Sequence, residues 1–119
     1  MIGMQKFSSS TAALTEEYGI EIGRWTEYGG TDFMPFGAMW CVIPPNSSSQ
    51  ADQHPEIELA VVVEGDADFD VAGAREHAPA GSAILLGSQE RHVIHNRSAG
   101  DPLVLLSMYW MPEGAGHAR

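Results

Sequence analysis

Residues 50–58 read QADQHPEIE, and this segment is the best guide to how the chain folds. Asp52, His54, Glu56 and Glu58 occupy every second position of the segment, and the apolar run 59–63 follows directly. In an extended strand these four side chains would project from one face. Carboxylates are rarely buried without a partner or a metal ion. An inward-facing strand of this kind is therefore typical of a divalent-cation site, where imidazole and carboxylate ligands act together.

A second segment, Gly81–Asn96, has a related arrangement, in which an apolar run and a turn precede a histidine. Together the two segments resemble the two signature motifs of the cupin superfamily. His54 stands at the second histidine of the first motif; Glu58 follows it after three residues, and Gly65 follows Glu58 after six. In the second motif Gly81, His92 and Asn96 stand at full spacing. The resemblance spans about residues 37–110 and implies an all-β fold, a small cupin-type jelly-roll β-barrel.

The chain departs from the two motifs at four positions. Asp52 stands where the family has its first metal-binding histidine, and Asn46 stands at the opening glycine of the first motif. Gly87 and Gln89 replace the proline and the second glycine of the second motif, which alters a turn and need not change a ligand.

The ligand set that the resemblance implies is His54, Glu58 and His92, with Asp52 as a candidate fourth member. Asp52 either coordinates the ion or orients a ligand from behind, because aspartate is shorter than histidine. Without Asp52, two histidines and one carboxylate remain. That set is the facial triad, which leaves open positions on iron(II).

Short β-prone segments separated by turn residues occupy most of the chain. Strands are expected at about 19–25, 36–43, 58–63, 67–71, 75–77, 82–86, 91–96 and 102–110, and a helical turn at 14–18. Such a series predicts a β-sandwich or barrel. The length of 119 residues suits a single domain, 1–119, with one core at about 37–110. Residues 112–119 are expected to form a flexible tail.

Composition argues against several classes of partner. The net charge is −10, and only six residues are Lys or Arg, so neither nucleic acid nor an anionic membrane surface is an expected partner. No apolar run is long enough to span a bilayer. Cys41 is the sole cysteine, which excludes an intrachain disulfide and fits a reducing cytoplasm. We expect Cys41 to be a small buried hydrophobic residue.

Other residues in or near the motifs have expected roles outside the ligand set. Glu56 is either a solvated charge at the rim of the site or a general base beside the metal. Asn96 is expected at a turn or strand end rather than as a ligand. The aromatic and methionine residues at 33–40 and 108–111 favour a core and a homodimer interface. If half of them face the barrel, they would make an apolar cavity for an organic ligand.

Two functions fit these observations. The first is a metal-dependent enzyme acting on a small organic substrate and holding one divalent ion, which is iron(II), zinc, nickel or manganese. The resemblance implies a dioxygenase, isomerase, lyase or cyclase, in specialised metabolism. The second is a non-catalytic cupin that binds a small ligand or serves regulation, because a fold alone does not determine function.

Overall fold

The computed structural model describes residues 4–28 and 31–113, and these residues are almost entirely β-structure. The strands are β1 (Thr15–Glu17), β2 (Ile20–Arg24), β3 (Gly37–Ile43), β4 (Ile57–Glu64), β5 (Asp66–Val71), β6 (Ala74–Pro79), β7 (Ala83–Leu86), β8 (His92–Asn96) and β9 (Leu103–Trp110). Three short 3₁₀ segments, η1 (Ser9–Thr11), η2 (Trp25–Glu27) and η3 (Thr31–Phe33), complete the described elements. None of the helical segments in this part of the chain has the length and apolarity to cross a membrane.

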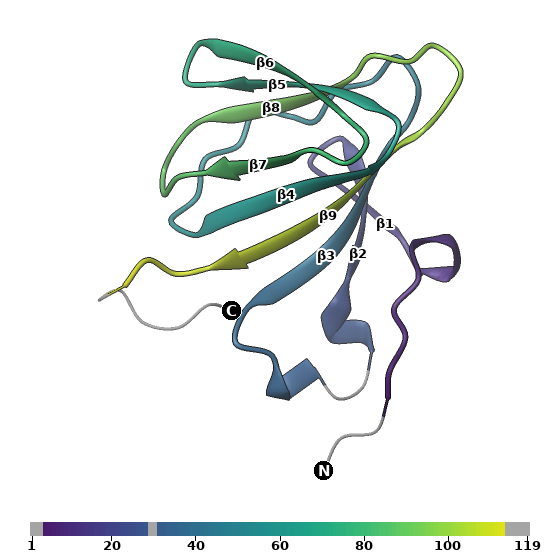
Figure 1. Ribbon diagram of the computed structural model, residues 1–119, viewed down its shortest axis with the longest axis vertical. Helices are drawn as coiled ribbons and strands as arrows, with labels where there is room; N and C mark the ends of the chain where they lie inside the picture. The colour runs from purple at the N-terminus through teal and green to yellow at the C-terminus, as the bar shows by residue number, and fades with distance from the viewer. Residues whose placement is uncertain (1–3, 29–30, 114–119) are drawn as a thin grey trace.

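The strands form two antiparallel sheets that enclose the core (Figure 1). One sheet has six strands in the order β1-β2-β3-β9-β4-β7, and the other has three in the order β6-β5-β8. Some neighbouring strands are far apart in sequence, as in the β3–β9 and β5–β8 pairs. This arrangement confirms the all-β, jelly-roll fold that the motif spacing predicts.

The core lies between the two sheets and is built from alternate positions of the strands. Phe69 and Leu105 are fully buried, and burying a side chain of this size contributes about 1.5–3 kcal/mol. Ile20 and Ile22 of β2 belong to the same cluster. The buried core therefore extends amino-terminally of the predicted 37–110 segment. Of the predicted tail, 112–119, residues 114–119 lie outside the described part of the chain.

The strands expected from the sequence are present, but the helical turn expected at 14–18 is wrong. Thr15–Glu17 forms β1 and pairs with β2 in a hairpin. Tyr18 and Gly19 both have positive φ, 56° and 76°, which reverses the chain tightly enough for the two strands to pair. Tertiary pairing has overridden the weak local preference.

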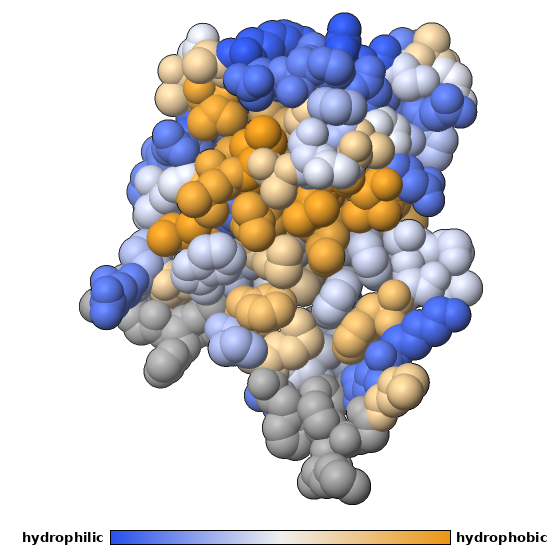
Figure 2. All heavy atoms as spheres, in the orientation of Figure 1, coloured by the Kyte–Doolittle hydropathy of each residue, from blue (hydrophilic) through white to orange (hydrophobic). Residues whose placement is uncertain are grey.

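The outer faces of the two sheets differ in chemistry. On β5 the outward positions are Asp66, Asp68 and Asp70, whereas on β4 they are apolar. Figure 2 shows the result, an apolar area over β4, β7 and β9 and a hydrophilic surface over β5 and β6. Leu85, at the centre of β7, is 64% exposed.

The homodimer remains a prediction. Among the apolar residues at 33–40 and 108–111 that favour an interface, Trp40 is 8% exposed and packs on Trp25, with ring centroids 5.3 Å apart. The outer apolar face of β4, β7 and β9 is more exposed and is a second candidate for the interface. Sedimentation at micromolar concentration is expected to give a dimer, and a monomer alone would contradict this.

The turn between β4 and β5 requires a glycine, and a neighbouring turn provides the control. A Cβ on Gly65 would lie 2.8 Å from the carbonyl oxygen of Pro102, whereas one on Gly73 would meet nothing within 4 Å. Both residues have positive φ, 96° and 87°, so either alanine substitution should lower the free energy of unfolding by about 1–2 kcal/mol through backbone strain. Gly65→Ala should lower it by a further ~1–3 kcal/mol because of the collision. Urea unfolding of the two variants measures the difference, and equal losses of stability would refute the steric argument.

Candidate metal centre

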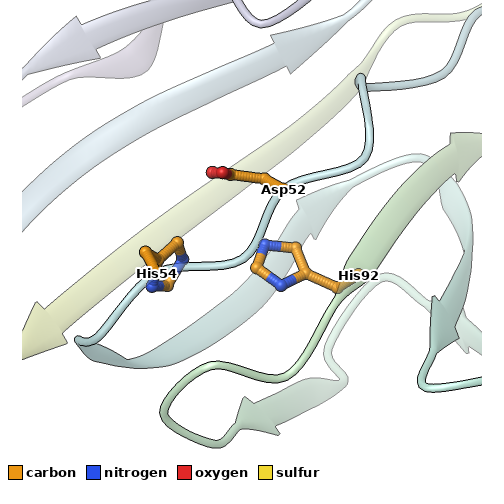
Figure 3. Close-up of side chains that lie close together, drawn as sticks. All are labelled: Asp52, His54 and His92. Atoms are coloured by element: carbon orange, nitrogen blue, oxygen red, sulfur yellow. The ribbon is translucent and has the colours of Figure 1, made fainter.

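Backbone pairing brings the two motif segments together at the start of β8. Asp52 and His92 form an isolated antiparallel bridge, with N···O distances of 3.0 and 2.9 Å between their main chains. The turn before β8 contacts the segment that follows Asp52, because the Gln89 amide donates to the His54 carbonyl at 2.7 Å. Ser88 Oγ donates to the carbonyl of Pro55 at 2.6 Å. These contacts place Asp52, His54 and His92 close together, as Figure 3 shows.

The strand predicted at 58–63 is confirmed as β4, but the extended alignment of side chains considered for residues 52–58 is not formed. Regular strand begins only at Ile57, and the chain bends at Pro55 and Glu56. Proline has no amide hydrogen to offer a strand ladder, so the β structure cannot run through this point. Asp52 and His54 reach the site through the contacts with the 87–92 segment, and not through alternation along one strand.

Four side chains predicted from the sequence bring possible metal-ligand atoms close together. Three of them, Asp52, His54 and His92, each have one such atom, and these three atoms lie within 4.8 Å of one another. Glu58 is not part of that group. Glu58 instead approaches the two imidazoles, with Oε1 3.1 Å from His54 Nε2 and 4.0 Å from His92 Nε2. The site therefore brings two carboxylates close to the histidine pair.

Both imidazoles are held by the same kind of backbone contact. His54 Nδ1 lies 3.0 Å from the carbonyl oxygen of Glu56, and His92 Nδ1 lies 3.0 Å from that of Glu90. A carbonyl only accepts, so each Nδ1 carries the proton and donates it. The Nε2 atoms then face the centre, which is how metal-binding histidines are usually fixed.

Glu58 is the buried charge of the site. Glu58 is only 5% exposed to solvent. Burial alone would raise the pKa of its carboxyl, but hydrogen bonds from His54 and Ser107 outweigh burial and lower the pKa. The same hydrogen bond to Glu58 is the main reason that the pKa of His54 rises to about 9. In the metal-free protein the buried carboxylate is thus compensated by an imidazolium.

The donor set fits a divalent cation. Two fixed imidazole nitrogens and a buried carboxylate oxygen converge, and such mixed nitrogen and oxygen ligands suit iron, zinc, nickel or manganese. His54, Glu58 and His92 would hold the ion. Asp52 offers one ligand atom within 4.8 Å of those of His54 and His92, and its Oδ1 accepts the Gln53 amide at 2.8 Å.

The site opens into a cavity of about 470 Å³. Aliphatic side chains from β2, β3 and β8 form one part of its wall: Ile20, Ile22, Met39 and Ile94. Glu56 also lines it, with a carboxylate oxygen 3.7 Å from His54 Nδ1. Of the aromatic and methionine residues singled out from the sequence, Met39 and Tyr109 line the cavity among the described residues, so its wall is more mixed than an aromatic lining would be.

Two residues of the cavity and site were not predicted from the sequence. Arg24 lines the cavity, and Ser107 donates a hydrogen bond from Oγ to Glu58 Oε2 at 2.8 Å. Burial raises the pKa of Tyr109, so its phenol stays protonated at neutral pH. Ser107 had a detectable signal, because it is the one polar residue of the otherwise apolar run 103–108.

Comparison with known proteins agrees with this geometry. The family model described as "Cupin domain" matches residues 39–109, and the chain therefore belongs to the cupin family. No curated protein matches the sequence significantly.

Solved structures with the same fold have varied descriptions. A Cupin 2 conserved barrel domain protein from Salinispora arenicola is 25% identical, with a TM-score of 0.80 over 92% of this chain and 90% of that one. A predicted oxalate decarboxylase from Thermotoga maritima is 21% identical, with a TM-score of 0.73 over 88% and 97% of the two chains. The cupin domain of a XRE family transcriptional regulator from Enterobacter cloacae is 15% identical, with a TM-score of 0.66 over 80% and 99%. The last two likenesses concern the fold alone.

The stability of the metal-free protein should depend on His54. The pKa of His54 is raised from 6.5 to about 9, so its pairing with Glu58 stabilises the fold fully below pH 6.5. This contribution is lost as the pH rises through about 9. Chelator-treated wild type should therefore lose more thermal stability across this interval than His54→Gln, which cannot titrate there. Parallel melting curves for the two proteins would contradict the assignment.

Proposed function

We propose that this protein is a metal-dependent cupin enzyme that acts on a small organic molecule bound in the barrel cavity. The observation that carries the proposal is the fixed pair of imidazoles. His54 and His92 each donate Nδ1–H to a carbonyl, and each turns Nε2 toward the buried Glu58 carboxylate. A purely structural ion pair would not need both rings to be fixed in this way.

The bound cation would supply Lewis acidity and open coordination positions beside the cavity. His54, Glu58 and His92 are the proposed ligands, and Asp52 is the proposed fourth. The two imidazoles are neutral ligands, so the carboxylates offset the charge of the ion. Because metal ligands must be deprotonated, binding of the ion replaces the proton that His54 Nε2 shares with Glu58.

The remaining residues of the cavity bind and orient the substrate in this proposal. The aliphatic wall of Ile22, Met39 and Ile94 takes the apolar part of the molecule. Tyr109 offers a hydroxyl donor, since its pKa lies above the usual value. Glu56 is the proposed general base, because its carboxylate lies beside His54 at the cavity wall and is 28% exposed. A partly solvated carboxylate can accept a proton and release it to water.

The second candidate function is a non-catalytic ligand-binding module. It is favoured by the Enterobacter structure, which is a domain of a transcriptional regulator with the same fold. The two candidates differ in whether a metal is retained and whether Glu56 matters. A ligand-binding cupin has no requirement for a proton acceptor at the cavity wall.

Loss of either histidine should abolish stoichiometric metal binding. His54→Ala or His92→Ala removes one of the two nitrogen ligands, whereas His77→Ala removes an exposed imidazole that pairs with Asp66 on the outer face of the small sheet. Elemental analysis after purification without chelator, with iron(II), zinc or nickel supplied, is the measurement. His77→Ala should retain about one metal per chain, as the wild type does. Wild type that retains none after desalting would sink the enzyme proposal and leave the ligand-binding module.

The role of Asp52 separates into two measurable outcomes. As a direct ligand, Asp52→Ala should abolish stoichiometric metal together with activity. As a residue that orients a ligand, its loss should weaken metal affinity only about 10- to 100-fold. Chelator competition titrations distinguish the two, and an unchanged affinity would exclude Asp52 from the site altogether.

A further inference from the structure

One hydroxyl group interrupts the inward row of β9. Leu103 and Leu105 precede it on the same face, and all three residues are fully buried at 0% exposure. In the register of the sheet Ser107 lies opposite Ala60 of β4. Glu58 is the neighbouring inward-facing residue of β4, so it is diagonal to Ser107. Diagonal neighbours on antiparallel strands are within reach of side-chain contact. Burying a hydroxyl without a partner would be costly, so the contacts of Ser107 account for its presence there.

Ser107 distinguishes the two oxygens of the Glu58 carboxylate. Its Oγ donates to Oε2 at 2.8 Å, on the side facing β9. The other oxygen, Oε1, is the one that faces both imidazoles, at 3.1 Å from His54 Nε2 and 4.0 Å from His92 Nε2. A serine hydroxyl has a single proton to donate. While the hydroxyl donates to Oε2, the carboxylate cannot rotate about its Cγ–Cδ bond without breaking this hydrogen bond.

Cys41 completes this buried contact from β3. Its Sγ lies 3.7 Å from Ser107 Oγ, and the thiol is 2% exposed. Burial raises the pKa of Cys41 to about 12, so the thiol keeps its proton. Because the Ser107 proton is directed to Glu58, the thiol faces the remaining lone pairs of the hydroxyl oxygen. Among the described residues Cys41 has a hydrogen-bond contact with Ser107 and none with Glu58, which makes it a matched control.

We propose that Ser107 is a positioning residue that presents only Oε1 of Glu58 to the divalent cation of this site. The proposal rests on the metal-binding function proposed above. A carboxylate that binds through one oxygen occupies one coordination position, whereas one that binds through both occupies two. By holding Oε2, Ser107 keeps a position open on the side of the cavity, where a substrate oxygen can bind.

The test compares Ser107→Ala with Cys41→Ala, using cobalt(II) as the probe ion in the full-length protein. Cobalt(II) affinity is measured by chelator competition, and the visible absorption spectrum reports the coordination number. Ser107→Ala should weaken affinity about 10- to 100-fold, as expected for loss of a group that orients a ligand. Its spectrum should shift toward higher coordination number, because Glu58 is then free to bind through both oxygens. Cys41→Ala should keep both the affinity and the spectrum of the wild type.

The outcomes separate this proposal from the proposed function. Wild type that binds no cobalt(II) removes the metal function and this role with it. Wild type that binds, with Ser107→Ala matching it in affinity and spectrum, overturns the positioning role alone. A loss of urea stability in metal-free Ser107→Ala with an unchanged cobalt spectrum assigns the hydroxyl to the fold. Should Ser107→Ala not fold, Ser107→Cys in the Cys41→Ala background replaces it, because a thiol is a weaker donor and the same changes should appear at smaller size.

Discussion

The buried carboxylate of Glu58 is the constraint on which the rest of the site depends. Removing an ion from water costs several kcal/mol even after relaxation, and the cost is recovered only by well-placed partners. Glu58 has two kinds of partner, the Ser107 hydroxyl on one oxygen and the imidazoles on the other. The strand that carries it, β4, lies between β9 and β7 in the large sheet, whereas His92 comes from the small sheet. The site thus joins the two sheets, and its geometry is set by their packing.

Most of the fold could be predicted because the motif spacings describe turns as well as ligands. Gly65 and Gly81 both have positive φ, 96° and 95°, as turn glycines should. The departures are equally informative. Asn46 and Gln89, which stand at two motif glycines, have positive φ of 58° and 63°. Both positions have a backbone conformation that glycine favours although neither residue is glycine, so the spacing marked the turn where residue identity did not.

The site could be predicted only in part, because alternation along the chain was the wrong guide to it. Asp52, His54, Glu58 and His92 are close together, but the chain bends at Pro55 and Glu56, so the first three are not aligned along one extended segment. Their positions come from cross-chain contacts such as the Gln89 amide to the His54 carbonyl. Ser107 was missed for the same reason. Its importance follows from being diagonal to Glu58 on a neighbouring strand, and a single sequence does not reveal which strands are neighbours.

Asn96 illustrates how a motif residue can serve the site without binding a ligand. Its side-chain nitrogen lies 2.8–3.2 Å from the carbonyl oxygens of Ile43, Pro44 and Asp101, and its Oδ1 accepts the Ser98 amide at 2.8 Å. These contacts tie the end of β8 to the end of β3 and to the loop before β9. Asn96 therefore lies at a strand end, as expected, and its buried side-chain amide joins three segments there. His92 lies at the opposite end of the same strand, β8.

The charges around the cavity give the final argument for a cation. Asp52, Glu56 and Glu58 line it, and Arg24 carries the one permanent positive charge among the described lining residues. That guanidinium already contacts Glu17 at 2.6 Å, so it does little to offset the other carboxylates. A divalent ion between the histidines would bring the cavity close to neutrality. For the proposed enzyme, the same balance disfavours substrates with several negative charges and favours a neutral molecule that pairs an oxygen group with an apolar body.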